Sequence, residues 1–394
     1  LGVSPVSEPG LNELLSQNLS AGRLKFVSQL DSETAYDALW VTIDTPVDEN
    51  DHGQVKVVTN LITQAILNVP QDCRIIISSQ LPSGTTQKIR LALNEHLTQR
   101  NITLCYSPEN LRLGSAIKVF MDPDRIVVGV DSEVDRKFVE PLFASITDRI
   151  EWMSVVSAEM TKHAINAFLA ISVVFANEIA TIAEFEGANA SDIARGLRSD
   201  ARIGGKAYVL PGDSFAGGTL ARDIRYLEDK SRMHSHPLAL ISSVVPSNDA
   251  HANWAQNKIH QLIGDVRDKT FTICGLAYKV GTNTLRRSSA VALGDWLLGH
   301  GAILRVIDSE DVLLPPHWNG RVDRLSSVNE SLNDTDVLVI GAGYVAPSTD
   351  IKFSPIMRSD RTTLILDAGR RWPSLEQIDN VEYVFVGKER HRDE

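Results

Sequence analysis

The stretch SAEMTKHAINAFLAISVVFANEIATIAEFEGA, residues 157–188, decides how the chain is organised. Apolar side chains recur every three or four residues along it, which predicts one long helix that ends at Gly187. Such a helix is about twice the usual length, so we expect it to span a whole interface. Near its start, Lys162 and Asn166 are four residues apart and therefore project from one face.

A second informative block, DARIGGKAYVLPGDSFAGGTLARDIRYL, covers residues 200–227. Its glycines cluster around Phe215 and lead into Arg222 and Asp223. A lysine and an amide on a helix, together with a glycine loop that ends in a basic and an acidic residue, can hold an anionic substrate and move a proton. The two blocks together predict an enzyme site.

Composition excludes several classes of protein. The 394 residues suffice for two or three domains, and 43% apolar residues are enough for ordinary cores. A net charge of −11 argues against a nucleic-acid-binding surface. Cys73, Cys105 and Cys274 form no CxxC pair, which argues against a zinc site or a disulfide scaffold and fits a reducing cytoplasm. The longest apolar run, residues 164–176, is too short to cross a bilayer.

Residues 1–155 alternate between expected helices and strands. EPGLNELLSQNLSAG, residues 8–22, predicts a helix with Pro9 in its first turn. Near-continuous apolar strands predict a parallel sheet that is covered on both faces; these strands are expected within 38–46, 73–86, 102–111 and 124–130. Ligands of such sheets bind at the carboxyl ends of the strands, which here are residues 44–46, 78–80 and 107–109.

The rest of the chain predicts two further domains. Residues 156–265 favour an all-helical domain, and the alternation of strands and helices resumes over residues 266–394. The fold class is therefore α/β, with two doubly wound, Rossmann-like domains joined by a central helical domain.

One glycine motif has two possible interpretations, a cofactor loop or a simple turn. Residues 337–346 read VLVIGAGYVA, a strand followed by GxGxxA, which by itself matches the dinucleotide-binding fingerprint. That fingerprint needs a helix to begin at once, because the first amide groups of the helix bind the pyrophosphate. Pro347 and Pro355 interrupt the following residues. We therefore favour a glycine turn that closes a strand.

Two candidate site residues have structural alternatives. Lys162 could be a solvated helix lysine, although Asn166 and the glycine loop favour a functional role. Glu109 follows a strand-ending Ser-Pro, where a carboxylate can face a ligand or can cap a backbone amide.

Taken together, these blocks resemble the UDP-glucose/GDP-mannose dehydrogenase family over nearly the whole chain. AEMTKHAINAFLA and NEIA match its central-helix signature, and DARIG and FAGGTLARD resemble DxRIG and GFGGSCFPKD. Five other blocks resemble family motifs in the same order: EPGLNELL, IDTP, SSQLPSGTT, SPENLRLGSAIKVFMDPDRIVVG and GLAYKVGTNTLRRSS.

The resemblance implies an N-terminal NAD-binding domain over 1–155, a central helical dimerisation domain over 156–265 and a nucleotide-sugar-binding domain over 266–394. It also implies that NAD oxidises C6 of a nucleotide-activated hexose twice, from alcohol to aldehyde to acid. The implied partners are the nucleotide sugar and a second copy of the chain in a homodimer or larger homo-oligomer, with neither nucleic acid nor membrane.

The resemblance also implies the catalytic roles. Lys162 would polarise the C6 oxygen, helped by Asn166 and an ordered water. Asp223 would position the water and assist proton transfer, and Glu109 would be the general base for hydrolysis. The nucleophilic cysteine of the family falls at Thr219.

Further implied contacts involve the substrate and the cofactor. Four residues would line the nucleotide-sugar cleft: Leu111, Phe215, Gly217 and Lys279. Arg202 would reach the substrate of the neighbouring subunit, and three residues would face NAD: Thr45, Ser79 and Arg286.

The chain departs from the family in residues that the reaction and cofactor binding need. A threonine hydroxyl is far less acidic than a thiol and needs a dedicated base to act as a nucleophile. The first βαβ unit of the family, with GxGxxG and the ribose-binding acid, does not occur in these 394 residues, so we expect them alone to bind NAD weakly. Four smaller departures are Asn110 for Phe, Leu113 for Glu, Ala216 for Gly and Arg222 for Lys.

Two hypotheses follow from these features. The first is a nucleotide-sugar 6-dehydrogenase whose second oxidation is impaired, favoured by Lys162, Asn166, Asp223 and Glu109. The alternative is a catalytically inactive relative that acts as a nucleotide-sugar-binding or assembly subunit, favoured by Thr219.

Overall fold

The computed structural model describes residues 4, 6, 8–29, 36–48, 52–112, 114–328, 334–345 and 362–388. Leu113, Pro347 and Pro355 lie outside the described residues. The chain divides into two compact units, Leu1–Ile165 and Asn166–Glu394, and the boundary falls inside one long helix. The predicted division into three domains, at residues 155 and 265, stays a prediction.

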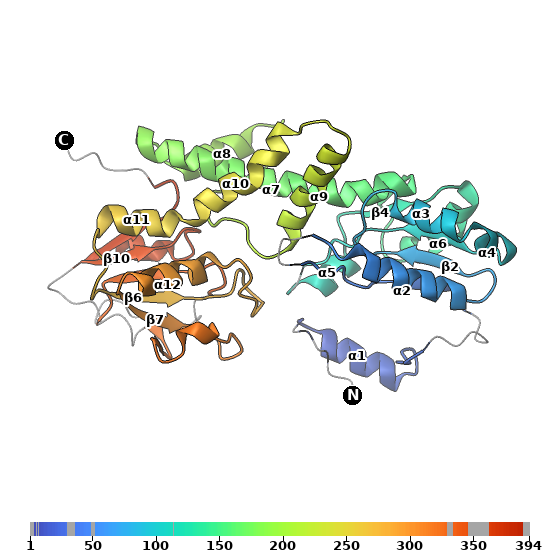
Figure 1. Ribbon diagram of the computed structural model, residues 1–394, viewed down its shortest axis with the longest axis horizontal. Coiled ribbons are helices and arrows are strands. Elements are labelled where there is room, and N and C mark those ends of the chain that lie inside the picture. Colours follow the sequence, from blue (N-terminus) through green and yellow to red (C-terminus); the bar gives the residue numbers. More distant parts are fainter. Residues whose placement is uncertain are drawn as a thin grey trace. The chain divides into compact units, whose positions relative to one another are not determined.

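The first unit contains a five-stranded sheet in the order β1-β2-β3-β4-β5; β2 and β4 are labelled in Figure 1. Its strands are β1 (Ala38–Val41), β2 (Arg74–Ile77), β3 (Thr103–Tyr106), β4 (Ile126–Gly129) and β5 (Ile150–Met153). Its helices are α1 (Leu11–Ser20), α2 (Val55–Asn68), α3 (Thr85–Ala92), α4 (Asn94–Gln99), α5 (Ala116–Met121) and α6 (Glu133–Ala144). The core of this unit forms around β2, whose four residues are all buried.

Several details of the first unit differ from the sequence prediction. β4 runs antiparallel to β3 through the pair Tyr106 and Gly129, although a helix, α5, lies in the connection between them. β5 was not predicted, because its side chains are only partly buried and lack a continuous apolar run. α1 begins at Leu11, after Gly10 with a φ of 81°, so Pro9 lies in the preceding turn rather than in the helix.

The expectation that β1 is a buried strand is wrong. β1 pairs only with β2 among the described residues, and Trp40 in its middle is 36% exposed. An edge strand has neighbours on one side only, which explains this exposure despite its apolar sequence.

The carboxyl ends of the first three strands meet, as expected from their order. Thr45 Oγ1 donates a hydrogen bond to the carbonyl of Gln80 (2.7 Å), and Ser78 Oγ donates to the carbonyl of Ser107 (2.6 Å). Trp40 Nε1 donates in turn to Ser78 Oγ (2.7 Å). These bonds join the loops that follow β1, β2 and β3.

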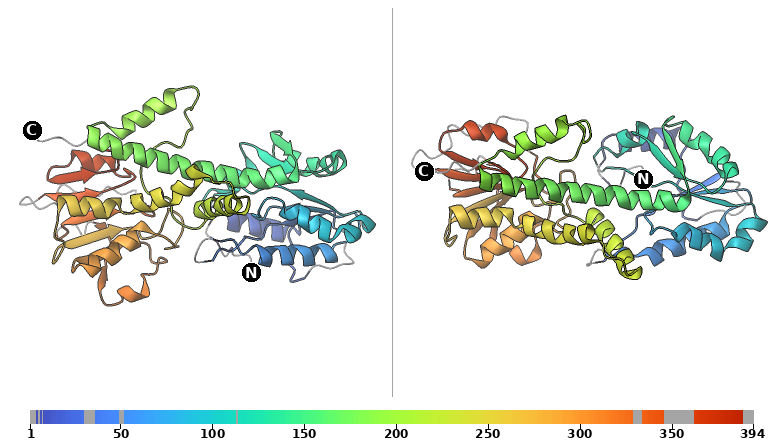
Figure 2. Two further views of the ribbon diagram at one scale, coloured as in Figure 1. Left: turned by 45° about the horizontal axis from the view of Figure 1, so that its top comes forward. Right: turned by 90° about the horizontal axis from the view of Figure 1, so that it is seen from above.

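The predicted long helix is confirmed as α7 (Val155–Glu186), a single uninterrupted helix (Figure 2). Gly187 ends it with a φ of 70°, and Ala188 N–H donates back to the Ala183 carbonyl (2.8 Å), as in a Schellman motif. Four more helices follow: α8 (Ala190–Ser199), α9 (Thr219–Met233), α10 (Ala239–Ala252) and α11 (Trp254–Leu262).

By length and composition alone, α7 is apolar enough to cross a membrane. Its polar side chains are nevertheless used inside the protein. Glu159 binds the start of α3, and Glu184 forms a buried ion pair with Lys258 (2.5 Å) and accepts from Gly387 N–H (2.9 Å). Such contacts are typical of the core helix of a globular domain.

The second unit contains a six-stranded parallel sheet in the order β11-β10-β9-β6-β7-β8. Its strands are β6 (Thr270–Cys274), β7 (Ile303–Ile307), β8 (Val322–Arg324), β9 (Val337–Ile340), β10 (Thr363–Leu366) and β11 (Val381–Val384), and α12 (Ser289–Gly299) follows β6. This order, with a reversal between β6 and β9, is the doubly wound arrangement that the sequence predicts. β8 and β11 were not predicted from the sequence.

The glycine motif after β9 forms a turn. Tyr344 N–H donates to the Gly341 carbonyl (3.2 Å), and Gly341 N–H donates to the Cys274 carbonyl (2.7 Å). A Cβ atom on Gly341 would lie 2.0 Å from the Gly275 carbonyl oxygen, and one on Gly343 would lie 2.5 Å from that of Ala277. These two glycines therefore allow the turns after β6 and β9 to touch, which accounts for the motif without a cofactor.

Candidate active site

The two main catalytic candidates of the first unit contact each other. Lys162 Nζ donates to the backbone carbonyl of Glu109 (2.5 Å) and lies 3.3 Å from its Oε1. The lysine side chain is only 9% exposed, so the alternative of a solvated lysine is wrong. The Glu109 side chain is 45% exposed, and its Oε2 accepts from Leu111 N–H (2.8 Å). Glu109 thus caps a backbone amide and also faces the ammonium group.

Two neighbours of Lys162 on α7 were missed by sequence reasoning. Glu159 is fully buried and accepts from Thr86 N–H (2.9 Å) and Thr86 Oγ1 (2.7 Å) at the start of α3. Burial raises the pKa of Glu159, and the hydrogen bonds from Thr86 and Gly84 oppose that rise. His163 Nε2 hydrogen-bonds the Leu81 carbonyl (2.9 Å). The sequence did contain a signal for both residues, because they are polar and lie within an otherwise apolar helical stretch.

These contacts attach α7 to the loop that carries Ser79. Ser79 Oγ is buried and has no hydrogen-bond partner among the described residues. A buried hydroxyl without a partner is costly unless a ligand satisfies it. Thr45, also buried, lies in the loop that follows the adjacent strand β1. Both residues therefore fit the edge of a cofactor site at the carboxyl ends of β1 and β2.

In the second unit, Asn166 Nδ2 donates to Asp223 Oδ2 (2.5 Å), and both residues are buried. Asp223 lies one turn into α9, which begins at Thr219 after Gly218. Thr219 is exposed at this helix N-terminus. An anion beside Thr219 would be stabilised by the backbone amides of the first turn and by the helix dipole.

The glycine loop before α9 packs against the loop after β6. Gly217 N–H donates to the Arg286 carbonyl (3.3 Å). Gly217 has a φ of 73°, and a Cβ atom there would lie 2.9 Å from the ring of Tyr278. Lys279 Nζ lies 5.6 Å from the centre of the same ring. The structure thus brings together Gly217, Lys279 and Arg286, which are far apart in the sequence.

Phe215 and Arg202, the two remaining candidates of the second unit, lie in other surroundings. Phe215 is half-buried and packs against a cluster formed by α7, α9 and α10. Arg202 is 89% exposed and pairs with Asp200 (2.7 Å). The role of Arg202 toward a neighbouring subunit stays a prediction.

The three cysteines cannot replace the family nucleophile. Cys105 lies in β3 and Cys274 in β6, Cys73 directly precedes β2, and all three are buried. Burial raises the pKa of Cys105 to about 12 and also raises the pKa values of Cys73 and Cys274. Thiols in such positions are not nucleophilic near neutral pH.

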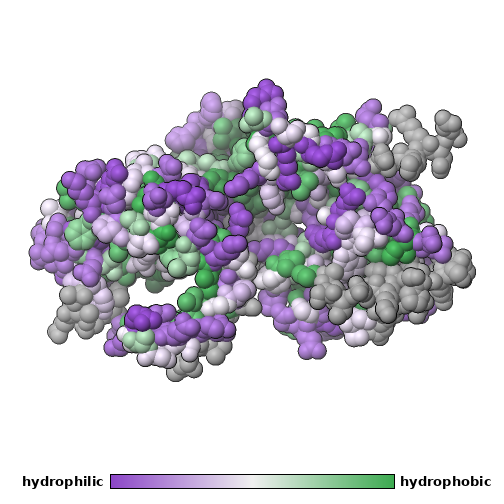
Figure 3. Space-filling view, turned by 180° about the vertical axis from the view of Figure 1, so that it is seen from behind, coloured by the Kyte–Doolittle hydropathy of each residue, from purple (hydrophilic) through white to green (hydrophobic). Residues whose placement is uncertain are grey.

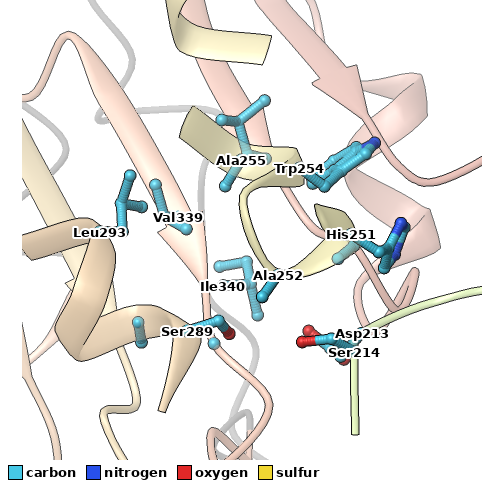
Figure 4. A pocket seen from close by; sticks show the side chains of 14 residues that line it. Asp213, Ser214, His251, Ala252, Trp254, Ala255, Ser289, Leu293, Val339 and Ile340 are labelled. Atoms are coloured by element: carbon cyan, nitrogen blue, oxygen red, sulfur yellow. The ribbon is translucent and has the colours of Figure 1, made fainter. Parts of the chain in front are cut away.

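A small pocket of about 40 Å³ lies in the second unit (Figure 4). Its lining comes from the loop before α9, from α10, α11 and α12, and from the ends of β9 and β10, and includes Asp213, Ser214, His251, Trp254 and Ser289. None of the residues predicted for the site from the sequence lines it. It adjoins the loop before α9 through Asp213 and Ser214.

Comparison with known proteins places this fold in one class of enzymes, the nucleotide-sugar dehydrogenases. Residues 1–147 match the NAD-binding domain of the UDP-glucose/GDP-mannose dehydrogenase family, and residues 156–250 match its central domain. UDP-glucose 6-dehydrogenase YwqF of Bacillus subtilis is 30% identical over 98% of this chain and 88% of its own length. UDP-glucose 6-dehydrogenase of Rickettsia felis is 30% identical over 87% of this chain and 78% of its own.

Two solved structures share the fold. A UDP-glucose dehydrogenase from Pyrobaculum islandicum superposes with a TM-score of 0.81 at 24% identity, covering 98% of this chain and 88% of its own. A UDP-D-ManNAc dehydrogenase from Pyrococcus horikoshii gives a TM-score of 0.81 at 21% identity, covering 98% and 90%. The chain belongs to the UDP-glucose/GDP-mannose dehydrogenase family, and its cofactor is NAD.

Proposed function

We propose that the protein oxidises C6 of a nucleotide-activated hexose with NAD, that the first oxidation is efficient and that the second is impaired. The observation that supports this most strongly is the desolvated ammonium of Lys162, held against the Glu109 carbonyl and carboxylate. Asn166, one turn later on α7, and its partner Asp223 supply the second pair of polar groups. The family and the curated relatives support the general activity.

For the first oxidation, NAD supplies the hydride acceptor. Lys162 stabilises the negative charge that develops on the C6 oxygen, which is the electrostatic role that contributes most in such sites. Asn166 fixes the carboxylate of Asp223 by donating to it, so that the carboxylate can accept a proton through a bound water. Thr45 and Ser79, in the loops after β1 and β2, would contact the cofactor, and the Ser79 hydroxyl, which has no partner among the described residues, would offer it a hydrogen bond.

The second oxidation is the step that Thr219 changes. In the family reaction a thiolate attacks the aldehyde, and the adduct loses a second hydride before water releases the acid. A threonine alkoxide is not available near neutral pH. The route that remains is hydration of the aldehyde by water activated at Glu109 or Asp223, followed by hydride loss from the gem-diol. We infer that this route is slower, because a positioned base contributes only about 10²–10⁴-fold.

A binding subunit without catalysis is the second candidate function. The exposed Thr219 at the nucleophile position, together with three buried cysteines, favours it. A panel of UDP- and GDP-linked hexoses, incubated with the full-length protein and NAD, separates the two. NADH formation with any member of the panel supports the dehydrogenase, and tight sugar binding without NADH supports the binding subunit.

We also propose a homodimer through α7. Phe168, Phe175 and Ile182 are seven residues apart and are 68%, 44% and 58% exposed. In the view of Figure 3 the surface is largely hydrophilic, with hydrophobic residues in small groups. An apolar stripe of period seven is typical of a helix that packs against another helix. We expect the buried interface to exceed about 2,000 Å², as in obligate dimers.

Phe175→Glu is therefore expected to convert a dimer to monomers, because two carboxylates would be buried near the dimer axis. Light scattering at micromolar concentration measures the change. Val134→Glu, at a 71% exposed position on α6, serves as the control and is expected to leave the dimer intact. A native protein that is already monomeric would refute the proposed dimer.

Ser79→Ala is expected to weaken NAD binding several-fold, which corresponds to the loss of one hydrogen bond of about 1 kcal/mol. The KM for NAD should rise, whereas the KM for the nucleotide sugar should not change. Ser145→Ala removes a hydroxyl that donates to the Leu142 carbonyl at the end of α6, and is the control. An unchanged KM for NAD would show that Ser79 does not contact the cofactor.

A further inference from the structure

The loop between α8 and α9 has an unusual source of hydrogen bonds for its backbone. Residues 211–218 form neither helix nor strand, so their backbone groups need partners from elsewhere. Asn248 on α10 supplies two of them. Its Oδ1 accepts from Phe215 N–H (2.8 Å), and its Nδ2 donates to the Phe215 carbonyl (2.9 Å). Asn248 is buried, so water does not compete for these bonds.

Two more side chains hold the loop three residues earlier. Asn177 on α7 accepts from Gly212 N–H (2.9 Å) and donates to the Asp213 carbonyl (3.4 Å). His251 Nε2 hydrogen-bonds the Gly212 carbonyl (2.7 Å), so Nε2 carries a proton. Burial lowers the pKa of His251, and the bond to Gly212 and the nearby carboxylates of Asp213 and Glu184 oppose this shift.

A fourth side chain, which is charged, also holds this loop. Arg371, after β10, forms an ion pair with Asp213 and lies 3.4 Å from Asp367 Oδ1. Burial would lower the pKa of Arg371, but these two carboxylates raise it overall. Asp367 is itself fixed by Trp372 N–H (2.8 Å) and by the hydroxyl of Tyr383 (2.7 Å). The loop is thus anchored to the carboxyl end of the parallel sheet.

We propose that Asn177, Asn248, His251 and Arg371, here called the loop clamp, are positioning residues that fix the backbone of residues 212–215 for nucleotide-sugar binding. The clamp rests on the proposed function for its substrate. The same loop continues to Gly217 at the Tyr278 ring and to Thr219 at the start of α9. Fixing residues 212–215 therefore fixes where Phe215 and the N-terminus of α9 lie.

Fixing the loop is expected to strengthen substrate binding because it pre-organises the loop in the binding conformation. A loop that samples several conformations binds a ligand more weakly, in proportion to the fraction of molecules in the competent conformation. Side-chain amides that hold both the N–H and the carbonyl of one residue restrict its φ and ψ together. The clamp consequently raises the affinity for the substrate without touching it, which distinguishes its members from the catalytic residues.

Asn248→Leu tests this proposal, because leucine has a similar volume and can neither donate nor accept. Asn189→Leu is the matched control, since Asn189 caps α8 by accepting from Ser191 N–H (2.9 Å) and, among the described residues, does not bond residues 211–218. Hydrogen–deuterium exchange of the loop and calorimetric titration with UDP-glucose, or with the best member of the sugar panel, are measured on the full-length variants. We expect Asn248→Leu alone to lose protection at Phe215 and to bind the sugar about tenfold more weakly, with unchanged NAD affinity.

Asn248→Asp covers the case in which Asn248→Leu does not fold. The carboxylate keeps the acceptor for Phe215 N–H but opposes the Phe215 carbonyl, whereas a protonated carboxyl can donate to it. Sugar affinity relative to the native protein is therefore expected to rise as the pH falls through the pKa of this carboxyl. Equal protection and equal affinity in the native protein and both Asn248 variants would overturn the clamp. If the native protein binds no nucleotide sugar, the proposed function fails, and exchange at Phe215 alone then decides whether the clamp exists.

Discussion

Replacing Thr219 by cysteine is expected to raise the yield of NADH from one per sugar towards two. The native protein should complete the first oxidation and then stall at the aldehyde, because Thr219 cannot supply a thiolate. A cysteine at the same position would lie at the N-terminus of α9, after Gly218, which has no side chain. The backbone amides and dipole of a helix N-terminus lower the pKa of a thiol there and so increase the thiolate fraction.

Rapid-quench measurement of NADH per nucleotide sugar checks this prediction. Thr219→Ser is the matched control, since it keeps a hydroxyl of similar acidity and should keep the native yield of one NADH. Two NADH formed at one uniform rate by the native protein, unaffected by Thr219→Cys, would show that the second oxidation needs no covalent nucleophile.

Lys162→Met is expected to lower kcat for the first oxidation by about 10²–10³-fold, the usual cost of removing one donor that stabilises an oxyanion. Methionine keeps the length of the side chain and loses the charge. The reason for the large effect is burial, because Lys162 is 9% exposed and its ammonium acts in a site with little water. The KM for the nucleotide sugar should change much less, since the interaction is made chiefly in the transition state.

Pre-steady-state formation of NADH measures this loss directly. Lys137→Met, which removes an exposed lysine on α6, is the control and should retain native kcat. A native rate for Lys162→Met would mean that the pair with Glu109 only stabilises the fold.

The sequence was informative where one physical signal dominated. The apolar periodicity and Gly187 predicted α7 closely, and the observed helix differs from the prediction by two residues at its start. The burial of β1 was predicted wrongly, because an apolar run indicates a strand but not whether a second strand lies beside Trp40. The antiparallel β4 was missed for a related reason, since side-chain pattern carries no direction of pairing.

For the site too, the sequence did not show which residues far apart in the chain lie side by side. Lys162 and Glu109 are 53 residues apart. The family resemblance assigned each of them a role, but neither the resemblance nor the spacing predicted their contact. The loop clamp was not predicted at all. Asn177, Asn248 and Arg371 are ordinary polar residues in the sequence, and only the packing of α7, α10 and β10 brings their side chains to one loop.

The proposed reaction is tested most directly by nuclear magnetic resonance of a nucleotide hexose labelled with ¹³C at C6, incubated with the full-length protein and NAD. We predict that the C6 alcohol signal is replaced by that of the aldehyde or its gem-diol, with slow appearance of the carboxylate. An unchanged C6 alcohol signal for every bound nucleotide sugar would contradict the dehydrogenase and would establish the binding subunit instead.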